Sequence, residues 1–136
     1  MSARRIEFTY LPTPHGSSYI WSPVIPVRIS KGRRTTPYLF RALIDSGADV
    51  NLIPALHGAI TGIDIKPGLA VRTHGVGGVV KAYRHNIKLI VGNKEFNTTA
   101  DFTYDFPLAL LGRRGFFDLF KKVSFREKEK VVVLDI

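Results

Sequence analysis

The chain has no cysteine, which excludes a disulfide framework and zinc sites built from thiolates. It has no run of about 18 uncharged apolar residues, so the sequence predicts no membrane-spanning helix. The segment Met1–Tyr10 lacks the apolar stretch of a secretory signal. Together these absences lead us to expect a cytoplasmic protein in a reducing compartment.

Acidic residues are few, because 11 Asp and Glu stand against 20 Lys and Arg, for a formal net charge of +9. A nucleic-acid binder more often gathers such charge on one helix, or interleaves it with aromatics on one face. In this chain the basic residues are scattered in short groups, several of them at expected turns. The pattern therefore argues against a nucleic-acid partner.

The four histidines fall in separate segments without the spacing of metal ligands. We therefore expect no metal site and no cofactor.

Short β-rich runs separated by turn residues fill most of the chain. Residues 24–29 and 38–44 flank one expected turn, and residues 87–91 and 94–102 flank another. Such strand spacing predicts an all-β domain over residues 1–136, built as a closed barrel or as packed sheets.

Two segments differ from this strand pattern. Residues 113–120 predict one short C-terminal helix, which Gly115 weakens. Residues 12–18, with Pro12, Pro14 and Gly16, read as a loop.

The most informative segment is Ala42–Pro54, in which an apolar strand runs directly into Asp45-Ser46-Gly47-Ala48 and a second apolar strand leaves it. A carboxylate at a tight turn between buried strands, beside backbone donors, is suited to acid–base catalysis. The tripeptide alone is more often simply a turn, since Asp, Ser and Gly are common turn residues.

Two further segments favour the catalytic interpretation. The run His74-Gly75-Val76-Gly77-Gly78 lies between two strands and predicts a flexible hairpin, residues 72–82, that closes over a ligand. It lacks the Lys-Ser/Thr pair of a phosphate-binding loop. The run Leu110-Leu111-Gly112-Arg113 ends an apolar strand in Gly-Arg, and Arg113 can pair with a buried Asp49 carboxylate.

Taken together and in this order along the chain, these three segments resemble the retropepsins, the aspartic proteases of retroviruses and their cellular relatives. The family pattern is apolar-apolar-Asp-Ser/Thr-Gly-Ala, a glycine-rich flap, and apolar-apolar-Gly-Arg before a short helix. Leu43–Ala48, Gly75–Gly78 and Leu110–Arg113 follow it in the same order. The resemblance extends from about Val24 to the C-terminus, and residues 1–22 form an N-terminal extension of uncertain role.

The resemblance implies a retropepsin-like closed barrel that acts as a symmetric homodimer. It implies that Asp45 is the catalytic acid and base, that Ser46 hydrogen-bonds across the dimer axis and that Gly47 faces the substrate backbone. It implies that Arg113 locks Asp49. The residues assigned to substrate binding or to the flap are Leu43, Ala48, Asp49, Val50, Leu52, Gly75, Val76, Gly77, Gly78, Val79, Leu108 and Leu110. For the larger apolar members of this set, ordinary core packing is the alternative.

One catalytic carboxylate is too few for this chemistry, which needs two carboxylates that share a proton. The chain has a single Asp-Ser-Gly, and a twofold symmetric dimer supplies the second copy. We expect residues 122–136 to form a C-terminal dimerisation hairpin.

We predict an aspartic endopeptidase that hydrolyses peptide bonds in extended polypeptide segments. The alternatives are a catalytically silent dimeric module that binds peptides or partners in the same groove, and a basic nucleic-acid-associated domain.

Overall fold

The computed structural model describes residues 4–75 and 78–136. Its helical segments are α1 (Ala55–Ile60) and the 3-10 helix η1 (Phe117–Leu119). In chain order the strands are β1 (Arg5–Thr9), β2 (Leu11–His15), β3 (Ser18–Ser22), β4 (Val24–Lys31), β5 (Arg34–Thr35), β6 (Phe40–Ile44), β7 (Leu52–Pro54), β8 (Leu69–Gly75), β9 (Gly78–Val91), β10 (Lys94–Thr103), β11 (Ala109–Leu111), β12 (Lys122–Arg126) and β13 (Val131–Asp135).

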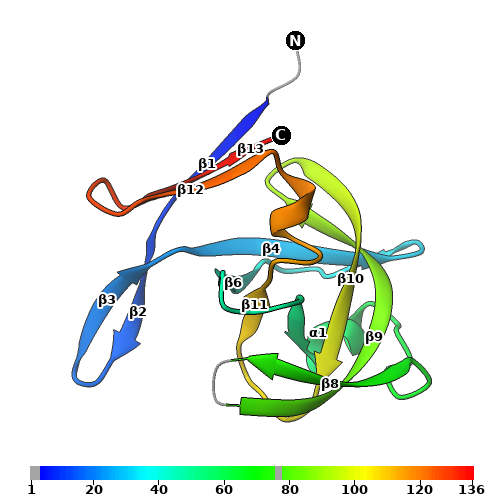
Figure 1. The fold of residues 1–136 in the computed structure, drawn as a ribbon. Coiled ribbons are helices and arrows are strands. Elements are labelled where there is room, and N and C mark those ends of the chain that lie inside the picture. Colours follow the sequence, from blue (N-terminus) through cyan, green and yellow to red (C-terminus); the bar gives the residue numbers. More distant parts are fainter. Residues whose placement is uncertain (1–3, 76–77) are drawn as a thin grey trace.

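A closed barrel forms the body of the molecule (Figure 1). Its strands follow one another in the order β4, β6, β11, β7, β10 and β9, and β9 returns to pair with β4. Strand β5 extends the sheet beside β4, and β8 extends it beside β9. Strand β11 runs parallel to β6, and β10 runs parallel to β7. The predicted all-β class and closed barrel are confirmed.

Strand β6 illustrates how the sequence fills the barrel. Phe40, Ala42 and Ile44 alternate along the strand and are buried in the main core. They share a face because successive side chains of a strand point to opposite sides. Leu43 therefore lies on the other face, where it packs against a second, smaller apolar cluster. The candidate site is built around that smaller cluster.

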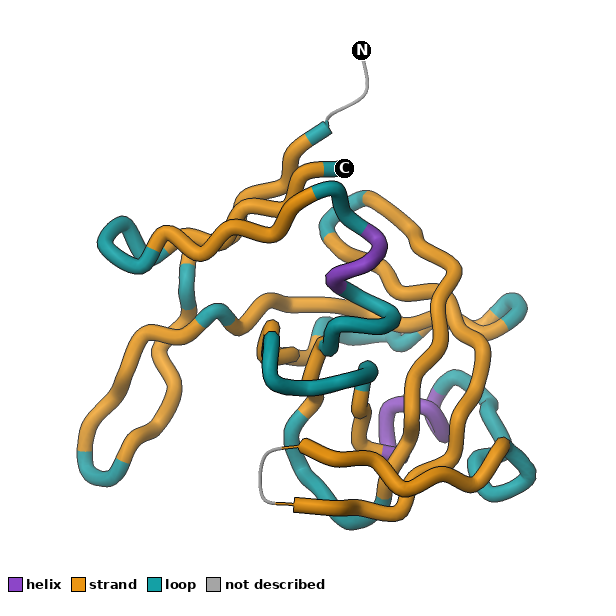
Figure 2. Tube along the Cα trace, viewed as in Figure 1, coloured by secondary structure: helices purple, strands orange, loops and turns teal. Residues whose placement is uncertain are grey.

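The helical segments are short (Figure 2), and they lie partly where the sequence did not predict them. Helix α1 was not predicted, and its Gly58 lets the helix approach Phe102 so closely that an added Cβ would lie 2.8 Å from that ring. In the predicted C-terminal helix, residues 113–120, η1 is the helical part. Gly115 adopts a φ of 107°, which a continuous helix does not allow. In the described part of the chain, no helix has the length and apolar character needed to cross a membrane.

The two ends of the chain form a separate three-stranded sheet in the order β1, β13, β12. Strand β1 pairs with β13 from Arg5 opposite Asp135 to Thr9 opposite Val131. Alternate residues of this sheet, including Phe8 and Leu134, pack against the main core. The predicted C-terminal hairpin, residues 122–136, thus lies beside the N-terminal strand of its own chain.

The prediction of a loop over residues 12–18 is wrong, because β2 and β3 form a hairpin there. Proline is accepted in an edge strand where its missing N–H would point away from the partner strand. Pro12 and Pro14 alternate along β2 and so satisfy this condition together. Gly16, in the connecting turn, has a φ of 61°. The proline signal for a loop was therefore an edge-strand signal.

Candidate active site

The Asp-Ser-Gly turn lies where three strand segments meet. Strand β11 lies between β6 and β7, the strands that enter and leave the turn, and Leu111 pairs with Ile44. The Asp45 N–H donates to the Leu111 carbonyl oxygen at 2.9 Å. The Ala48 N–H donates to the Asp45 carbonyl oxygen at 3.1 Å and closes the turn. The backbone on both sides of Asp45 is therefore fixed by hydrogen bonds.

The Asp45 side chain is oriented by the turn that follows it. Its Oδ1 accepts a hydrogen bond from the Gly47 N–H at 2.9 Å. Asp45 is half-buried, whereas Ser46 and Gly47 are exposed. A Cβ at Gly47 would lie 3.2 Å from Asp45 Oδ1, so glycine gives the carboxylate room at this distance. The result is an oriented carboxylate that a molecule outside the chain can reach.

Gly112 is required by a close approach of two backbones. A Cβ at this position would lie 2.4 Å from the carbonyl oxygen of Val50, a distance that the packing cannot accept. Val50 is buried and forms an isolated bridge with Arg114. The Gly-Arg motif thus lets the chain after β11 pass directly against the end of the Asp-Ser-Gly turn.

The side chain of Asn51 stabilises the same contact between the two backbones. Asn51 was not among the residues predicted from the sequence. Its Oδ1 accepts a hydrogen bond from the Gly112 N–H at 3.1 Å. Its Nδ2 donates to the carbonyl oxygens of Thr99 at 3.0 Å and Gly115 at 2.9 Å. Asn51 is fully buried. A polar residue directly before the apolar run Leu52–Pro54 was the available signal.

Asp49 and Arg113 form an ion pair in which Arg113 Nη2 donates to Asp49 Oδ1. Neighbouring backbone bonds support it, since the Arg113 N–H donates to the Ala48 carbonyl oxygen at 2.9 Å. The side chains of Arg113 and Asp49 are 62% and 44% exposed. The expected burial of this pair is therefore wrong for the single chain, in which both groups face solvent.

The glycine-rich hairpin is formed by β8 and β9, with Gly75 opposite Gly78. Gly78 has a φ of 110°, which requires glycine. Of the residues assigned to the tip, Val76 and Gly77 lie outside the described residues.

A compact apolar cluster joins the Asp-Ser-Gly turn to this hairpin. Its buried members come from the turn, from β7, from β9 and from β11, and partly buried residues of β6 and β8 pack against it. The buried members are Ala48, Leu52, Ala82 and Leu110, and the partly buried ones are Leu43, Val71, Val80 and Phe106. Four of the residues assigned to subsites, Leu43, Ala48, Leu52 and Leu110, are thus brought together. Val79 and Leu108 are instead exposed.

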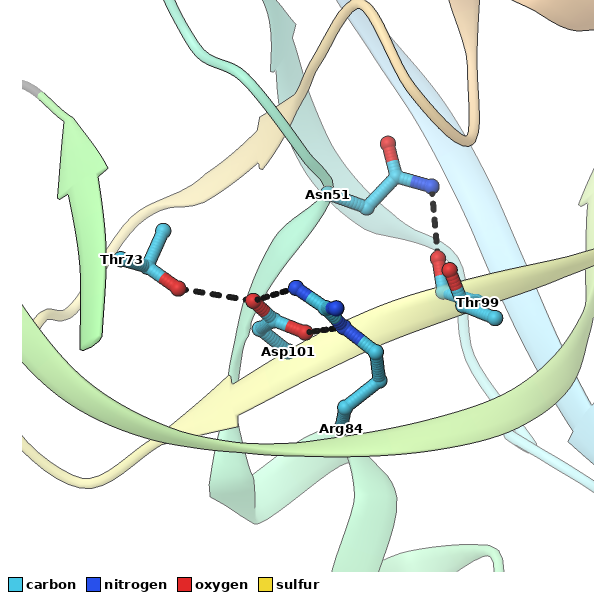
Figure 3. Close-up of polar contacts among 5 residues, drawn as sticks. All are labelled: Asn51, Thr73, Arg84, Thr99 and Asp101. Atoms are coloured by element: carbon cyan, nitrogen blue, oxygen red, sulfur yellow. Dashed lines mark hydrogen bonds and ion pairs between the residues drawn. The ribbon is translucent and has the colours of Figure 1, made fainter. Parts of the chain in front are cut away.

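A buried polar network anchors the hairpin strands to the barrel beneath them (Figure 3). Asp101 on β10 accepts hydrogen bonds from Arg84 Nε at 2.7 Å and from Arg84 Nη2 at 3.0 Å. Thr73 on β8 donates its hydroxyl to Asp101 Oδ2 at 2.7 Å. The hydrogen bond to Asp101 raises the pKa of Arg84 above its ordinary value. Three strands that lead to or support the hairpin are linked through one carboxylate.

Within residues 4–75 and 78–136, no group of three His, Asp or Glu side chains is placed to hold a metal ion. The site contains an oriented carboxylate, an apolar cluster and an exposed ion pair. Such a set of groups can position water and an apolar ligand.

No protein-family model matches the chain, and no curated protein matches it. Among solved structures, the EIAV protease complexed with the inhibitor HBY-793 matches with a TM-score of 0.51 and 20% sequence identity. The match covers 74% of this chain and 88% of that chain. The chain therefore has a retropepsin-like fold, similar to that of a retroviral protease.

Proposed function

We propose that the chain is an aspartic endopeptidase that works as a symmetric homodimer. Asp45 and its copy in the second chain form the catalytic pair, and the substrate is an extended polypeptide segment. The carboxylates share one proton, so that one activates a water molecule while the other protonates or polarises the scissile carbonyl.

The observation that carries the proposal is the position of Asp45 relative to the apolar cluster. The carboxylate is oriented by the Gly47 N–H at 2.9 Å, and Ala48, three residues on, belongs to the cluster that reaches the β8–β9 hairpin. A catalytic group beside an apolar surface under a hairpin is suited to hold an extended peptide over the carboxylate. The similarity to a retroviral protease supports the same assignment.

The other site residues have supporting roles in this proposal. Ser46, which is exposed next to Asp45, hydrogen-bonds across the twofold axis, and Gly47 faces the substrate backbone. Residues 72–82 act as the flap. Among the residues assigned to subsites, the partly buried Leu43 and the exposed Val79 and Leu108 are the ones that can contact substrate side chains. The other four are buried in the single chain and support the site from within: Ala48, Val50, Leu52 and Leu110.

The terminal sheet is the second part of the proposed dimer interface. Its hairpin, residues 122–136, uses β13 to pair with β1 of the same chain, so β1 and β12 are the edge strands. A second copy therefore reaches the sheet through β12 or β1, or over its outer face.

Cleavage of a peptide library by the wild type and by Asp45→Asn tests the function. We expect the wild type to cleave, a transition-state-analogue inhibitor of aspartic proteases to block it, and Asp45→Asn to lose at least about 10³-fold in rate. Asp45→Asn should keep the fold and the dimer. Peptide binding without cleavage by the wild type would instead identify the catalytically silent binding module.

A further inference from the structure

The hairpin formed by β2 and β3 projects from the barrel and takes no part in the site described above. Near its base, Arg41 Nη1 on β6 donates a hydrogen bond to the Pro12 carbonyl oxygen at 3.3 Å. We call residues Leu11–Ser22 the arm. Within the described chain its two strands pair only with each other, and Figure 1 shows it projecting beyond the start of β4. A two-stranded hairpin alone in water is marginally stable at best. An arm of this form is therefore stabilised by whatever packs against it.

One face of the arm consists of prolines and aromatics. Pro12 lies opposite Trp21 and Pro14 lies opposite Tyr19, and alternate residues of a strand share a face. The prolines place these pairs where facing side chains approach most closely. Tyr19 is 69% exposed and Trp21 is 55% exposed. The chain thus presents a preformed apolar surface that its own described residues do not cover.

The amino-acid composition of the arm indicates what kind of molecule binds to it. Leu11–Ser22 contains no Lys, Arg, Asp or Glu, although the whole chain has a net charge of +9. Nucleic-acid backbones are bound through cations, and membrane-surface segments carry basic residues on their polar face. Exposed Trp and Tyr on an uncharged surface are instead typical of the centre of a protein interface.

The root of the arm is fixed at the end of the barrel that carries Asp45. The Ile44 N–H donates to the Pro23 carbonyl oxygen at 3.0 Å, and Ile44 directly precedes Asp45. On the other side of the root, the Tyr10 N–H donates to the Lys130 carbonyl oxygen at 2.8 Å. These two backbone bonds, together with the Arg41–Pro12 bond, hold the base of the arm beside the Asp-Ser-Gly turn.

We propose that the arm is a clasp whose proline–aromatic face packs against the second copy of this chain. The inference rests on the proposed function, which requires Asp45 to meet its own copy at a twofold axis. The root is one strand spacing, about 4.8 Å, from β6, which ends at Ile44 directly before Asp45. Each arm strand has 5 residues, which corresponds to a length of about 17 Å. An arm that begins this near the axis and leaves its own barrel lies against the copy that approaches the same end.

Intrinsic fluorescence tests the proposal in the unmodified protein, because Trp21 is the single tryptophan of the chain. The wild type is diluted through its dimer dissociation constant while sedimentation gives the dimer fraction. We expect the Trp21 emission to shift to shorter wavelength in step with dimer formation, since the indole leaves water. Emission that stays at the solvent-exposed position in the dimer overturns the clasp and leaves the protease assignment intact.

A variant series tests the same contact independently. Tyr19→Ser with Trp21→Ser should raise the dimer dissociation constant by about tenfold or more. Activity per dimer should return to the wild-type value once the protein concentration exceeds the new constant. Leu39→Ser is the matched control, because Leu39 is 63% exposed and precedes the opposite end of β6. It should leave dimerisation unchanged.

Three results of this series contradict the clasp. An unchanged dissociation constant with a raised KM would assign the arm to the substrate. An unchanged dissociation constant with unchanged kinetics would leave the arm without either role. A wild type that sediments as a monomer at all concentrations would overturn both the clasp and the proposed dimeric protease.

Discussion

Two arginine–aspartate pairs lie in different surroundings in this molecule. Arg84 and Asp101 meet beneath the β8–β9 hairpin, where the Asp101 side chain is 1% exposed and accepts a third bond from Thr73. Arg113 and Asp49 meet beside the Asp-Ser-Gly turn, where both side chains face solvent. The sequence motif pointed to the exposed pair and gave no sign of the buried one.

The two ion pairs differ in how much each stabilises the fold of a single chain. A buried carboxylate that loses its partner stays out of water without compensation, so the rest of the structure depends on the pair. In an exposed pair, water solvates both charged groups, so the ion pair contributes little to the free energy of unfolding. The buried pair therefore stabilises the fold of the single chain. The exposed pair adds to the free energy of unfolding or of binding mainly when another surface covers it.

The largest effect is expected for Arg84→Ala, which strands the Asp101 carboxylate. The loss of stability should be about 3–5 kcal/mol, measured by denaturant unfolding at one fixed protein concentration. Lys88→Ala, at an exposed position of the same strand, is the control and should change stability by less than about 0.5 kcal/mol. Equal unfolding midpoints for the wild type and Arg84→Ala would contradict the assigned role.

A smaller loss is expected for Thr73→Val, which keeps the shape of the side chain and removes its hydroxyl. The bond to Asp101 Oδ2 is 2.7 Å long, and hydrogen bonds to charged groups contribute about 1.5–3 kcal/mol. Thr9→Val, an exposed change on β1, is the matched control when both variants are unfolded at a concentration where the chain is monomeric. A loss no larger than that of the control would show that β8 is not anchored through Asp101.

Arg113→Ala should lower the free energy of unfolding by less than about 1 kcal/mol at concentrations where the chain is monomeric, because both side chains of the ion pair are exposed. If a second copy covers the pair, the cost appears as a raised dimer dissociation constant. Unfolding of the monomer and sedimentation of the dimer separate the two. A large loss in the monomer would mean that the pair is buried there after all.

The local motifs were predictable because each depends on a few adjacent residues. Asp45-Ser46-Gly47 is a turn between apolar runs, and the glycines after His74, which lie between two β-rich runs, favour a hairpin. Gly112 before Arg113 was recognised as a motif, although its physical reason, the contact with the Val50 backbone, became visible only in the structure.

The remaining features depend on pairings between distant segments. Nothing near Asp101 in the sequence indicates that Arg84 will lie opposite it, because that register is set by the whole β9–β10 pair. The closure of the barrel by β4 and β9 is a long-range contact of the same kind. Pro12 and Pro14 favour a loop as strongly as an edge strand, and β3 decides between them.

The smallest change in stability is expected for a substitution of His57. This substitution tests whether burial of a titratable side chain without an ionic partner influences the free energy of unfolding. The ring of His57 stacks on Phe40 at 4.0 Å between centroids, and its Nδ1 lies 2.9 Å from the Tyr38 hydroxyl. Burial lowers the pKa of His57 from its ordinary value of 6.5, because the charged form loses hydration.

The unfolded chain therefore binds more protons than the folded chain just below pH 6.5. The stability contributed by neutral His57 is complete above that pH and is lost as the pH falls through the lower, folded pKa. His57→Gln should flatten the dependence of the unfolding free energy on pH below 6.5. Leu56→Gln, a change at a 63% exposed position of the same helix, should leave the slope of the wild type unchanged. Equal slopes for the wild type and His57→Gln would show that the burial of this ring does not affect its protonation.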